Sequence, residues 1–239
     1  MKSIFIMHHL GLGDHIVCNG LVRELMKKCD LIYFPVKHHN FATVKFMFRD
    51  MSRKIKYIPI NSDNEMTYWG TLNREAFDEC VRLGNFYENN FVNRHKSFCK
   101  GFYDNANIDY EKRWESFYVD YGEPEISTTK TDYNFLHEDK SRGYIIADTY
   151  KEQEYCEPNH TLGQNSETTI FDYYNIIKNS KQIHCMDSAF SAWIDHIKEL
   201  EDKPKYIHRY VKKYKEPDGM WQFYGNNWKI IENPEATWN

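Results

Sequence analysis

Short apolar runs alternate with helix-like segments over the first 60 residues. The apolar runs are SIFIMHH (3–9), LIYFPV (31–36) and KIKYIPI (54–60). The segments between them, 15–29 and 40–51, are long enough for helices, and the first places Ile16, Leu21, Val22 and Leu25 on one helical face. Strands that alternate with helices at this spacing predict a parallel sheet with right-handed crossovers.

The same alternation restarts after a polar segment, YGEPEISTTKTD (121–132), which we interpret as a linker because it contains Pro124 and few apolar residues. Beyond it we expect strands over 133–137, 144–148, 181–187 and 204–211. Helices are expected over 166–180, beginning at Ser166, and over 188–201. The chain is therefore predicted to be α/β, with two units, 1–125 and 126–239.

The middle of the chain is less regular. We expect a helix over 73–84 that ends at Gly84 and another over 94–107. The aromatic segment 110–120 is compatible with a packing helix or with a hairpin.

Composition excludes several classes of protein. A formal charge of −4 gives no basic footprint for nucleic acid, and the stretch RYVKKYK (209–215) is better explained as a solvated face. We find no apolar run of 18 residues and no export signal, so we expect no transmembrane segment. The six cysteines form no CxxC pair and are expected to be reduced, which favours a cytoplasmic location.

The turn GLGD (11–14) joins the first strand to the first helix. Gly11 and Gly13 fit a dinucleotide fingerprint, but Ile16 stands where the third glycine belongs, and no G-K-S/T follows for a P-loop. Asp14 lies at the carboxyl end of a predicted parallel strand, where ligands bind in such sheets. It either caps the helix or acts as a general base.

The stretch GLGDHIVCNGLVREL (11–25) resembles the opening of glycosyltransferases with two Rossmann-like domains, the GT-B fold, and especially the bacterial heptosyltransferases. The resemblance implies a cleft between the two units, with the acceptor on the N-terminal one and the nucleotide sugar on the C-terminal one. It implies that Asp14 deprotonates the acceptor hydroxyl and that Gly11 and Gly13 let the acceptor approach. His15, with His8 and His9, is a candidate to hydrogen-bond substrate oxygens.

A second stretch, IHCMDSAFSAWIDH (183–196), resembles the strand–Asp–Ser–helix turn of heptosyltransferases and an S-x-F-S-x-W element of fucosyltransferases. Asp187, Ser188 and Ser191 would then lie beside free amides at a helix start, where phosphate binding is favoured. The alternative is ordinary capping by Asp187 or Ser188, with Phe190 and Trp193 in the core.

A third stretch, FLHEDKSRGY (135–144), resembles the first strand and loop of a GT-B donor domain. The resemblance makes His137, Asp139 and Arg142 candidates for donor binding, with the Arg142 guanidinium on the diphosphate. A surface turn with a local Asp139–Arg142 pair is the alternative.

The histidines His8, His9, His15, His38 and His39 fall near the ends of the first two strands, but no HxH or HExxH spacing occurs. The resemblance implies a metal-independent enzyme, and we expect no cofactor.

The resulting hypothesis is a glycosyltransferase of glycan biosynthesis that moves a sugar from a nucleotide diphosphate sugar to a glycan or other hydroxyl acceptor, with inversion at the anomeric carbon. Two alternatives stay open. One is a nucleotide-sugar epimerase or hydrolase of the same fold. The other is a non-catalytic protein that binds glycans or nucleotides.

Overall fold

The computed structural model describes residues 1–84, 98–124, 126–158, 168–212, 225 and 227–234. The described chain separates after Asp120 into two units, which we call unit 1 (up to Asp120) and unit 2 (from Tyr121). The cleft between the two units stays a prediction.

Unit 1 contains a parallel sheet, as the alternation of apolar runs predicts. Its strands are β1 (Ser3–Met7), β2 (Leu31–Lys37), β3 (Ile55–Ile60) and β4 (Glu79–Arg82). Their order is β3-β2-β1-β4, with every neighbouring pair parallel. All five residues of β1 are buried. The chain runs outward from β1 to β3 and then returns to the other side of β1, which makes the boundary between β1 and β4 a topological switch point.

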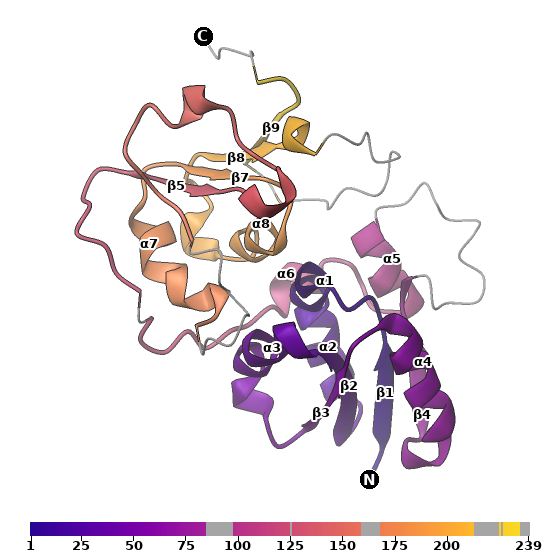
Figure 1. Ribbon diagram of the computed structural model, residues 1–239. Coiled ribbons are helices and arrows are strands. Elements are labelled where there is room, and N and C mark those ends of the chain that lie inside the picture. The colour runs from indigo at the N-terminus through magenta and orange to yellow at the C-terminus, as the bar shows by residue number, and fades with distance from the viewer. Residues whose placement is uncertain (85–97, 125, 159–167, 213–224, 226, 235–239) are drawn as a thin grey trace. The chain divides into compact units, whose positions relative to one another are not determined.

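The first predicted helix is divided at Cys18 into α1 (Leu12–Val17) and α2 (Asn19–Met26). A 3₁₀ turn (His38–Asn40) leads into α3 (Phe41–Met47), and a second turn (Arg49–Met51) follows it. Apolar residues on one face of the sheet, including Phe5 and Met7, form a core cluster with Met66 of the next helix, α4 (Asp63–Leu72). Figure 1 shows α4 alongside β1 and β4.

The predicted helix over 73–84 is wrong. The helix, α4, ends at Leu72, a 3₁₀ turn spans Arg74–Ala76, and the next element is the strand β4. Tertiary pairing overrides the local helical pattern here, because β4 gains a parallel ladder with β1 from Ile4↔Glu79 to Met7↔Arg82. The start of α4 has a sequence signal, Ser62 followed by Glu65, and Ser62 Oγ accepts the Glu65 N–H at 3.2 Å.

Two further helices complete the described part of unit 1. The helix α5 (Phe98–Asn105) confirms the described part of the prediction over 94–107, of which 94–97 lie outside the described residues. Within 110–120 the structure forms a short helix, α6 (Lys112–Glu115). It buries Arg113, whose guanidinium donates a 2.8 Å hydrogen bond to the Tyr110 hydroxyl and lies over the Trp114 ring.

Unit 2 contains a second parallel sheet. Its strands are β5 (Asn134–His137), β6 (Tyr155–Cys156), β7 (Ile183–Cys185), β8 (Lys205–His208) and β9 (Trp228–Ile231). Their order is β6-β5-β7-β8-β9, and each neighbouring pair is parallel. The strands predicted over 133–137, 181–187 and 204–211 are confirmed, and β9 was not predicted. The switch point of this sheet lies between β5 and β7.

The predicted strand over 144–148 is wrong. Tyr144 makes an isolated antiparallel bridge to Asp139, and the second strand of the sheet is instead β6. The backbone explains the difference, because the Ile146 N–H donates to the buried carboxylate of Glu138 rather than to a neighbouring strand.

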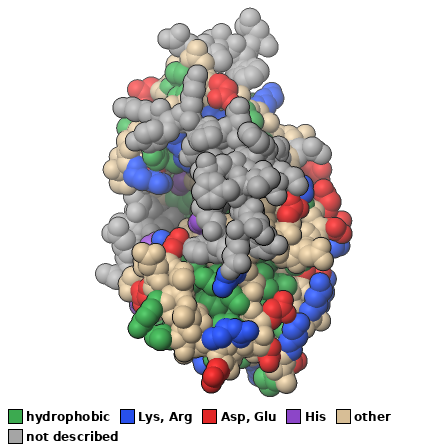
Figure 2. Space-filling model, turned by 90° about the vertical axis from the view of Figure 1, so that its right-hand side faces the viewer, with side chains coloured by type: hydrophobic (Ala, Val, Ile, Leu, Met, Phe, Trp, Pro, Cys, Tyr) green, Lys and Arg blue, Asp and Glu red, His purple; other side chains and the backbone are tan. Residues whose placement is uncertain are grey.

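The helices of unit 2 are shorter than predicted. Ser166 lies outside the described residues, and Thr169 caps a 3₁₀ turn (Ile170–Tyr173) that continues as α7 (Tyr174–Asn179). The helix expected over 188–201 is α8 (Ala189–Ile194) with a 3₁₀ turn (Lys198–Leu200). On the face drawn in Figure 2, Lys and Arg side chains are interspersed with Asp and Glu.

Candidate active site

The turn after β1 brings Asp14 back over Gly11. Gly11 is the extended residue before α1, and Asp14 is the third residue of that helix. A Cβ on Gly11 would lie 2.6 Å from Asp14 Oδ2, far inside normal contact distance, so the glycine makes room for the carboxylate. Asp14 is therefore not the residue that precedes the helix. Its side chain instead accepts a hydrogen bond from the Gly11 backbone.

The environment of Asp14 favours a proton. Burial raises the pKa of Asp14 to about 6, although the hydrogen bond from Gly11 acts in the opposite direction. Two charged side chains add smaller effects: Asp63 raises the pKa and Lys37 lowers it. A carboxylate with a pKa this close to neutrality is a suitable general base, since it is largely ionised at pH 7 yet more basic than an ordinary aspartate.

Lys37 and Asp63 lie at the same edge of the sheet as Asp14, and neither was predicted from the sequence to belong to the site. Lys37 ends β2 and Asp63 begins α4, which follows β3. Asp63 lies between the Lys37 ammonium, at 3.8 Å, and the His9 imidazole, at 3.9 Å. Their position at successive strand ends is the signal that could have identified them, because the carboxyl ends of parallel strands converge.

The three histidines near the turn differ in exposure. His8 and His15 are fully buried, with ring centroids 4.5 Å apart, and both rings contact Phe34. Burial lowers the pKa of His8 to about 3 and the pKa of His15 well below its ordinary value. His9 keeps some exposed surface. Of these three candidates, only His9 presents surface to a ligand in the described structure.

His9 also lies at the switch point of the unit 1 sheet. Gly84, just beyond β4, has a φ of 63°, in the left-handed region. A Cβ there would lie 2.9 Å from the His9 ring and 2.7 Å from Phe102. Glycine is thus required at position 84 both by its φ and by the close approach of His9.

In unit 2 the predicted residues gather at the ends of β5 and β7. His137 Nδ1 lies 3.1 Å from Ser188 Oγ, within hydrogen-bonding distance. Ser188 and Ser191 form a reciprocal capping box at the start of α8, and Ser191 is fully buried. Asp187, between β7 and this cap, is also buried. Phe190 and Trp193 lie in the core, so the capping arrangement that the sequence left open is formed.

Asp139 and Arg142 form the local pair that was the alternative to donor binding. Arg142 Nε lies 2.6 Å from Asp139 Oδ2, and the guanidinium lies over the Tyr144 ring. Burial raises the pKa of Asp139, but hydrogen bonds from Ser141 and Arg142 outweigh it and hold the pKa below its ordinary value. The Arg142 side chain is still 61% exposed, which leaves surface for a ligand.

A buried acid next to this loop was also missed. The Glu138 carboxylate, just after β5, has no exposed surface and accepts the Ile146 N–H at 2.8 Å. Lys151 Nζ lies 2.9 Å from Glu138 Oε2. These contacts anchor residues 144–151 to the end of β5. The sequence feature that could have identified Glu138 is an acidic residue directly after an apolar strand.

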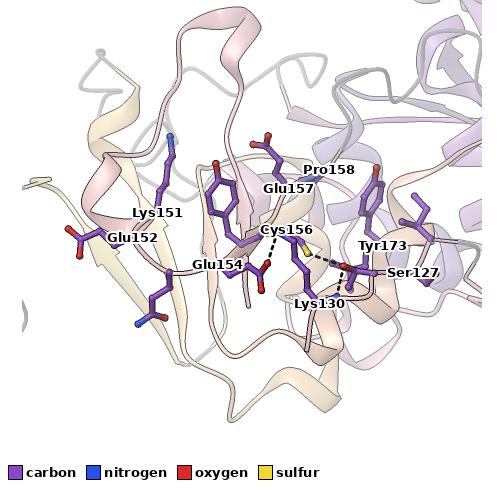
Figure 3. Close-up of a pocket in the computed structure, with 14 residues that line it drawn as sticks. Ser127, Lys130, Lys151, Glu152, Glu154, Cys156, Glu157, Pro158 and Tyr173 are labelled. Atoms are coloured by element: carbon purple, nitrogen blue, oxygen red, sulfur yellow. Dashed lines mark hydrogen bonds and ion pairs between the residues drawn. The ribbon is translucent and has the colours of Figure 1, made fainter. Parts of the chain in front are cut away.

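A pocket of about 870 Å³ lies along β6 and contains none of the predicted site residues. Figure 3 shows Lys130, Glu154 and Glu157 among its lining side chains. Lys130 donates to the Tyr155 carbonyl at 2.8 Å and lies 3.5 Å from Glu154. Its charges are mixed, so the pocket points to no single ligand class.

The residues that the structure describes contain no group of three or more His, Cys, Asp or Glu side chains arranged to hold a metal ion. No helix within them is both long and apolar enough to cross a membrane.

Comparison with known proteins gives no match to a protein-family model and none to a curated protein. Solved structures do match. The E. coli heptosyltransferase WaaC with ADP is 10% identical at a TM-score of 0.50, over 96% of this chain and 92% of WaaC. WaaC with ADP-2-deoxy-2-fluoro heptose matches at 10% identity and a TM-score of 0.50, over 97% and 93% of the two chains.

A third match is TibC, described as an iron-containing dodecameric glycosyltransferase from enterotoxigenic E. coli. It is 11% identical at a TM-score of 0.54, over 99% of this chain and 64% of TibC. The likeness of DSAFSAW to fucosyltransferases stays a prediction. At sequence identities this low, the matches establish a similarity of fold and nothing more. The chain has the two-unit α/β fold of the GT-B glycosyltransferases, as the resemblance of its N-terminal turn predicts.

Proposed function

We propose that this chain is a glycosyltransferase in which Asp14 removes the proton of an acceptor hydroxyl while the hydroxyl attacks the anomeric carbon of a nucleotide diphosphate sugar. One observation carries the proposal: a partly buried carboxylate, with a pKa raised to about 6, lies at the carboxyl edge of the unit 1 sheet. This edge is where parallel α/β sheets bind ligands. The fold shared with WaaC and TibC supports the reaction class.

Unit 2 binds the donor in this proposal. WaaC was solved with ADP and with an ADP-sugar analogue, which makes a nucleoside diphosphate the donor class to test first. The exposed Arg142 guanidinium contacts the diphosphate, because a guanidinium binds two phosphate oxygens at once and keeps its charge. His137, Asp187, Ser188 and Ser191 shape the turn beside it, with Asp139 orienting Arg142.

The reaction is a single displacement. The acceptor oxygen forms a bond to the anomeric carbon as the bond to the diphosphate breaks, and the acceptor proton passes to Asp14. A single displacement inverts the anomeric configuration. Charge develops on the departing diphosphate, where Arg142 stabilises it.

Asp14→Asn tests the proposal. Asparagine keeps the shape of the side chain but removes its basicity. We expect single-turnover transfer to fall by about 10²–10⁴-fold, with donor binding and folding retained. Glu115→Gln, an exposed acid of α6, is the matched control and leaves the rate unchanged.

Substrates for this assay come from a thermal-shift screen that starts with ADP, since a ligand at about 100 times its Kd stabilises the folded protein by about 2.7 kcal/mol.

A near-parental rate in Asp14→Asn would remove Asp14 from the mechanism. Donor turnover without any acceptor would instead support a hydrolase or epimerase. Binding without turnover would support a non-catalytic protein.

A further inference from the structure

The helical segment that follows the glycine turn of unit 1 is interrupted at one point. The helix α1 ends at Val17, and α2 begins at Asn19. The ladder is intact on either side of the break, since the Cys18 N–H donates to the Asp14 carbonyl at 2.9 Å and the Val22 N–H donates to the Cys18 carbonyl at 2.8 Å. The interruption is therefore short, and a break of this kind has a local cause.

A side chain from a helix far along the chain occupies the break. In a continuous helix the Leu21 N–H donates to the Val17 carbonyl, four residues earlier. Here the hydroxyl of Tyr103, in α5, accepts the Leu21 N–H at 3.2 Å and donates to the Val17 carbonyl at 2.8 Å. All three residues are buried. The hydroxyl thus bridges the two groups that would close the ladder, and such insertions bend or break helices.

The packing around the break leaves room for this hydroxyl because residue 20 is glycine. A Cβ on Gly20 would lie 3.2 Å from the Tyr103 hydroxyl oxygen and 2.1 Å from the backbone carbonyl oxygen of Lys112, in α6. A side chain there would push both groups away. Burial also raises the pKa of Tyr103, so the hydroxyl keeps the proton that it donates. The hydroxyl is therefore held by packing as well as by its two hydrogen bonds.

The break lies close to Asp14 in the same short helix. The helix α1 has six residues, which is less than about two turns, and Asp14 is its third residue. Its start is placed by the approach of the Asp14 carboxylate to Gly11. Its end is placed by the bond from Tyr103 to the Val17 carbonyl. In a helix this short, a change of direction at the end also moves Asp14.

We propose that Tyr103 is a positioning residue whose hydroxyl keeps the helix open between α1 and α2 and so determines where Asp14 lies in the candidate site. The catalytic consequence rests on the proposed function, because it follows only if Asp14 is the base. The insertion itself is a property of unit 1 and can be measured without substrate.

The first test is NMR spectroscopy of the unaltered full chain. The Tyr103 hydroxyl proton should exchange slowly enough to be observed and should give a nuclear Overhauser effect to the Leu21 amide proton. The Leu21 amide should show no scalar coupling across a hydrogen bond to the Val17 carbonyl carbon. Absence of the Overhauser effect, or presence of that coupling, would overturn the proposal.

Tyr103→Phe then removes the hydroxyl and keeps the ring. The direct bond from Leu21 to Val17 should form, so the scalar coupling should appear. The Gly11 amide, which donates to the Asp14 carboxylate, should titrate with Asp14 in the parent and lose most of that pH dependence in the variant. Single-turnover transfer should fall by about tenfold or more with ADP affinity unchanged, because the base has moved from the acceptor.

Tyr110→Phe is the matched control. Its ring packs edge-on against Tyr103, with centroids 5.5 Å apart, but its hydroxyl accepts a hydrogen bond from Arg113 and not from the α1–α2 ladder. This variant should keep the parental Gly11 titration and transfer rate and show no coupling between Leu21 and Val17. If Tyr103→Phe does not fold, Tyr103→Met replaces it, since methionine fills irregular space and also lacks the hydroxyl.

Three results would overturn the proposal: no coupling between Leu21 and Val17 in the variant without the hydroxyl, an unchanged Gly11 titration there, or equal losses of rate in the Tyr103 and Tyr110 variants. If both NMR measurements are as expected but Asp14→Asn keeps its transfer rate, the positioning role of Tyr103 stands and the assignment of Asp14 as base fails.

Discussion

The Asp14 carboxylate occupies the space that a side chain at Gly11 would need, with Oδ2 only 2.6 Å from the position of a Cβ there. The contact is with the end of a side chain that can rotate, while Gly11 itself has an extended backbone that any residue adopts. Gly11 therefore determines where the carboxylate lies more than whether the helix forms.

Gly11→Ala is expected to displace Asp14 while the fold is kept. Transfer should fall by about tenfold or more, because general-base catalysis needs the carboxylate within hydrogen-bonding reach of the acceptor. The melting temperature should change little. The measurement pairs single-turnover transfer with a melting curve, and a parental rate in Gly11→Ala would show that the close approach has no catalytic importance.

Asp14→Asn should also stabilise the protein at neutral pH. The pKa of Asp14 is raised to about 6 in the folded chain from an ordinary value of 3.8. Between these values the folded state binds the extra proton, so the contribution of Asp14 to stability is greatest at low pH and is lost as pH rises through about 6. We expect urea denaturation to find Asp14→Asn more stable than the parent at pH 8.

That stability difference should shrink as the pH falls from 8 to 4, which a simple loss of contacts would not produce. An Asp14→Asn variant less stable than the parent at every pH would indicate that the carboxylate is a structural group.

A buried pair of histidines should make unit 2 sensitive to acid. His184 Nδ1 lies 3.0 Å from His208 Nε2, and His208 Nδ1 lies 3.2 Å from the Tyr210 hydroxyl. Burial lowers the pKa of His184 to about 4 and that of His208 to about 3. The unfolded chain binds protons below pH 6.5 that the folded chain does not, so stability is lost as pH falls from 6.5 towards 4.

His208→Gln tests this expectation, since it keeps a polar side chain but cannot titrate. Denaturation series at pH 7.5 and pH 5 should show a smaller loss for this variant than for the parent. Identical losses in the two proteins would mean that His208 does not contribute to the acid sensitivity.

Arg142→Ala should weaken nucleoside diphosphate binding far more than nucleoside binding. The expected loss is a charge-assisted hydrogen bond to phosphate, about 1.5–3 kcal/mol or roughly tenfold to a hundredfold in affinity. Calorimetry with ADP and adenosine measures both. Equal losses for the two ligands would assign Arg142 to its local contacts with Asp139 and Tyr144.

The sequence by itself indicated two α/β units and, among the strands that the structure describes, all but β4, β6 and β9, and it placed Asp14 at a strand end. Apolar runs such as SIFIM and LIYFPV are local patterns that show their period within a few residues. The glycine turn likewise places an acid just after a strand, and strand ends are where such sheets bind ligands.

Only the tertiary structure decided how distant segments pair. ECVR became the strand β4 because it gained a ladder with β1, more than 70 residues earlier in the chain. The Glu138 carboxylate accepts a hydrogen bond from the Ile146 N–H. This backbone group therefore does not pair with a neighbouring strand, and residues 144–148 form no strand. Lys37 and Asp63 joined the site of Asp14 for the same reason: a parallel sheet gathers the carboxyl ends of its strands at one edge, whatever their separation in sequence.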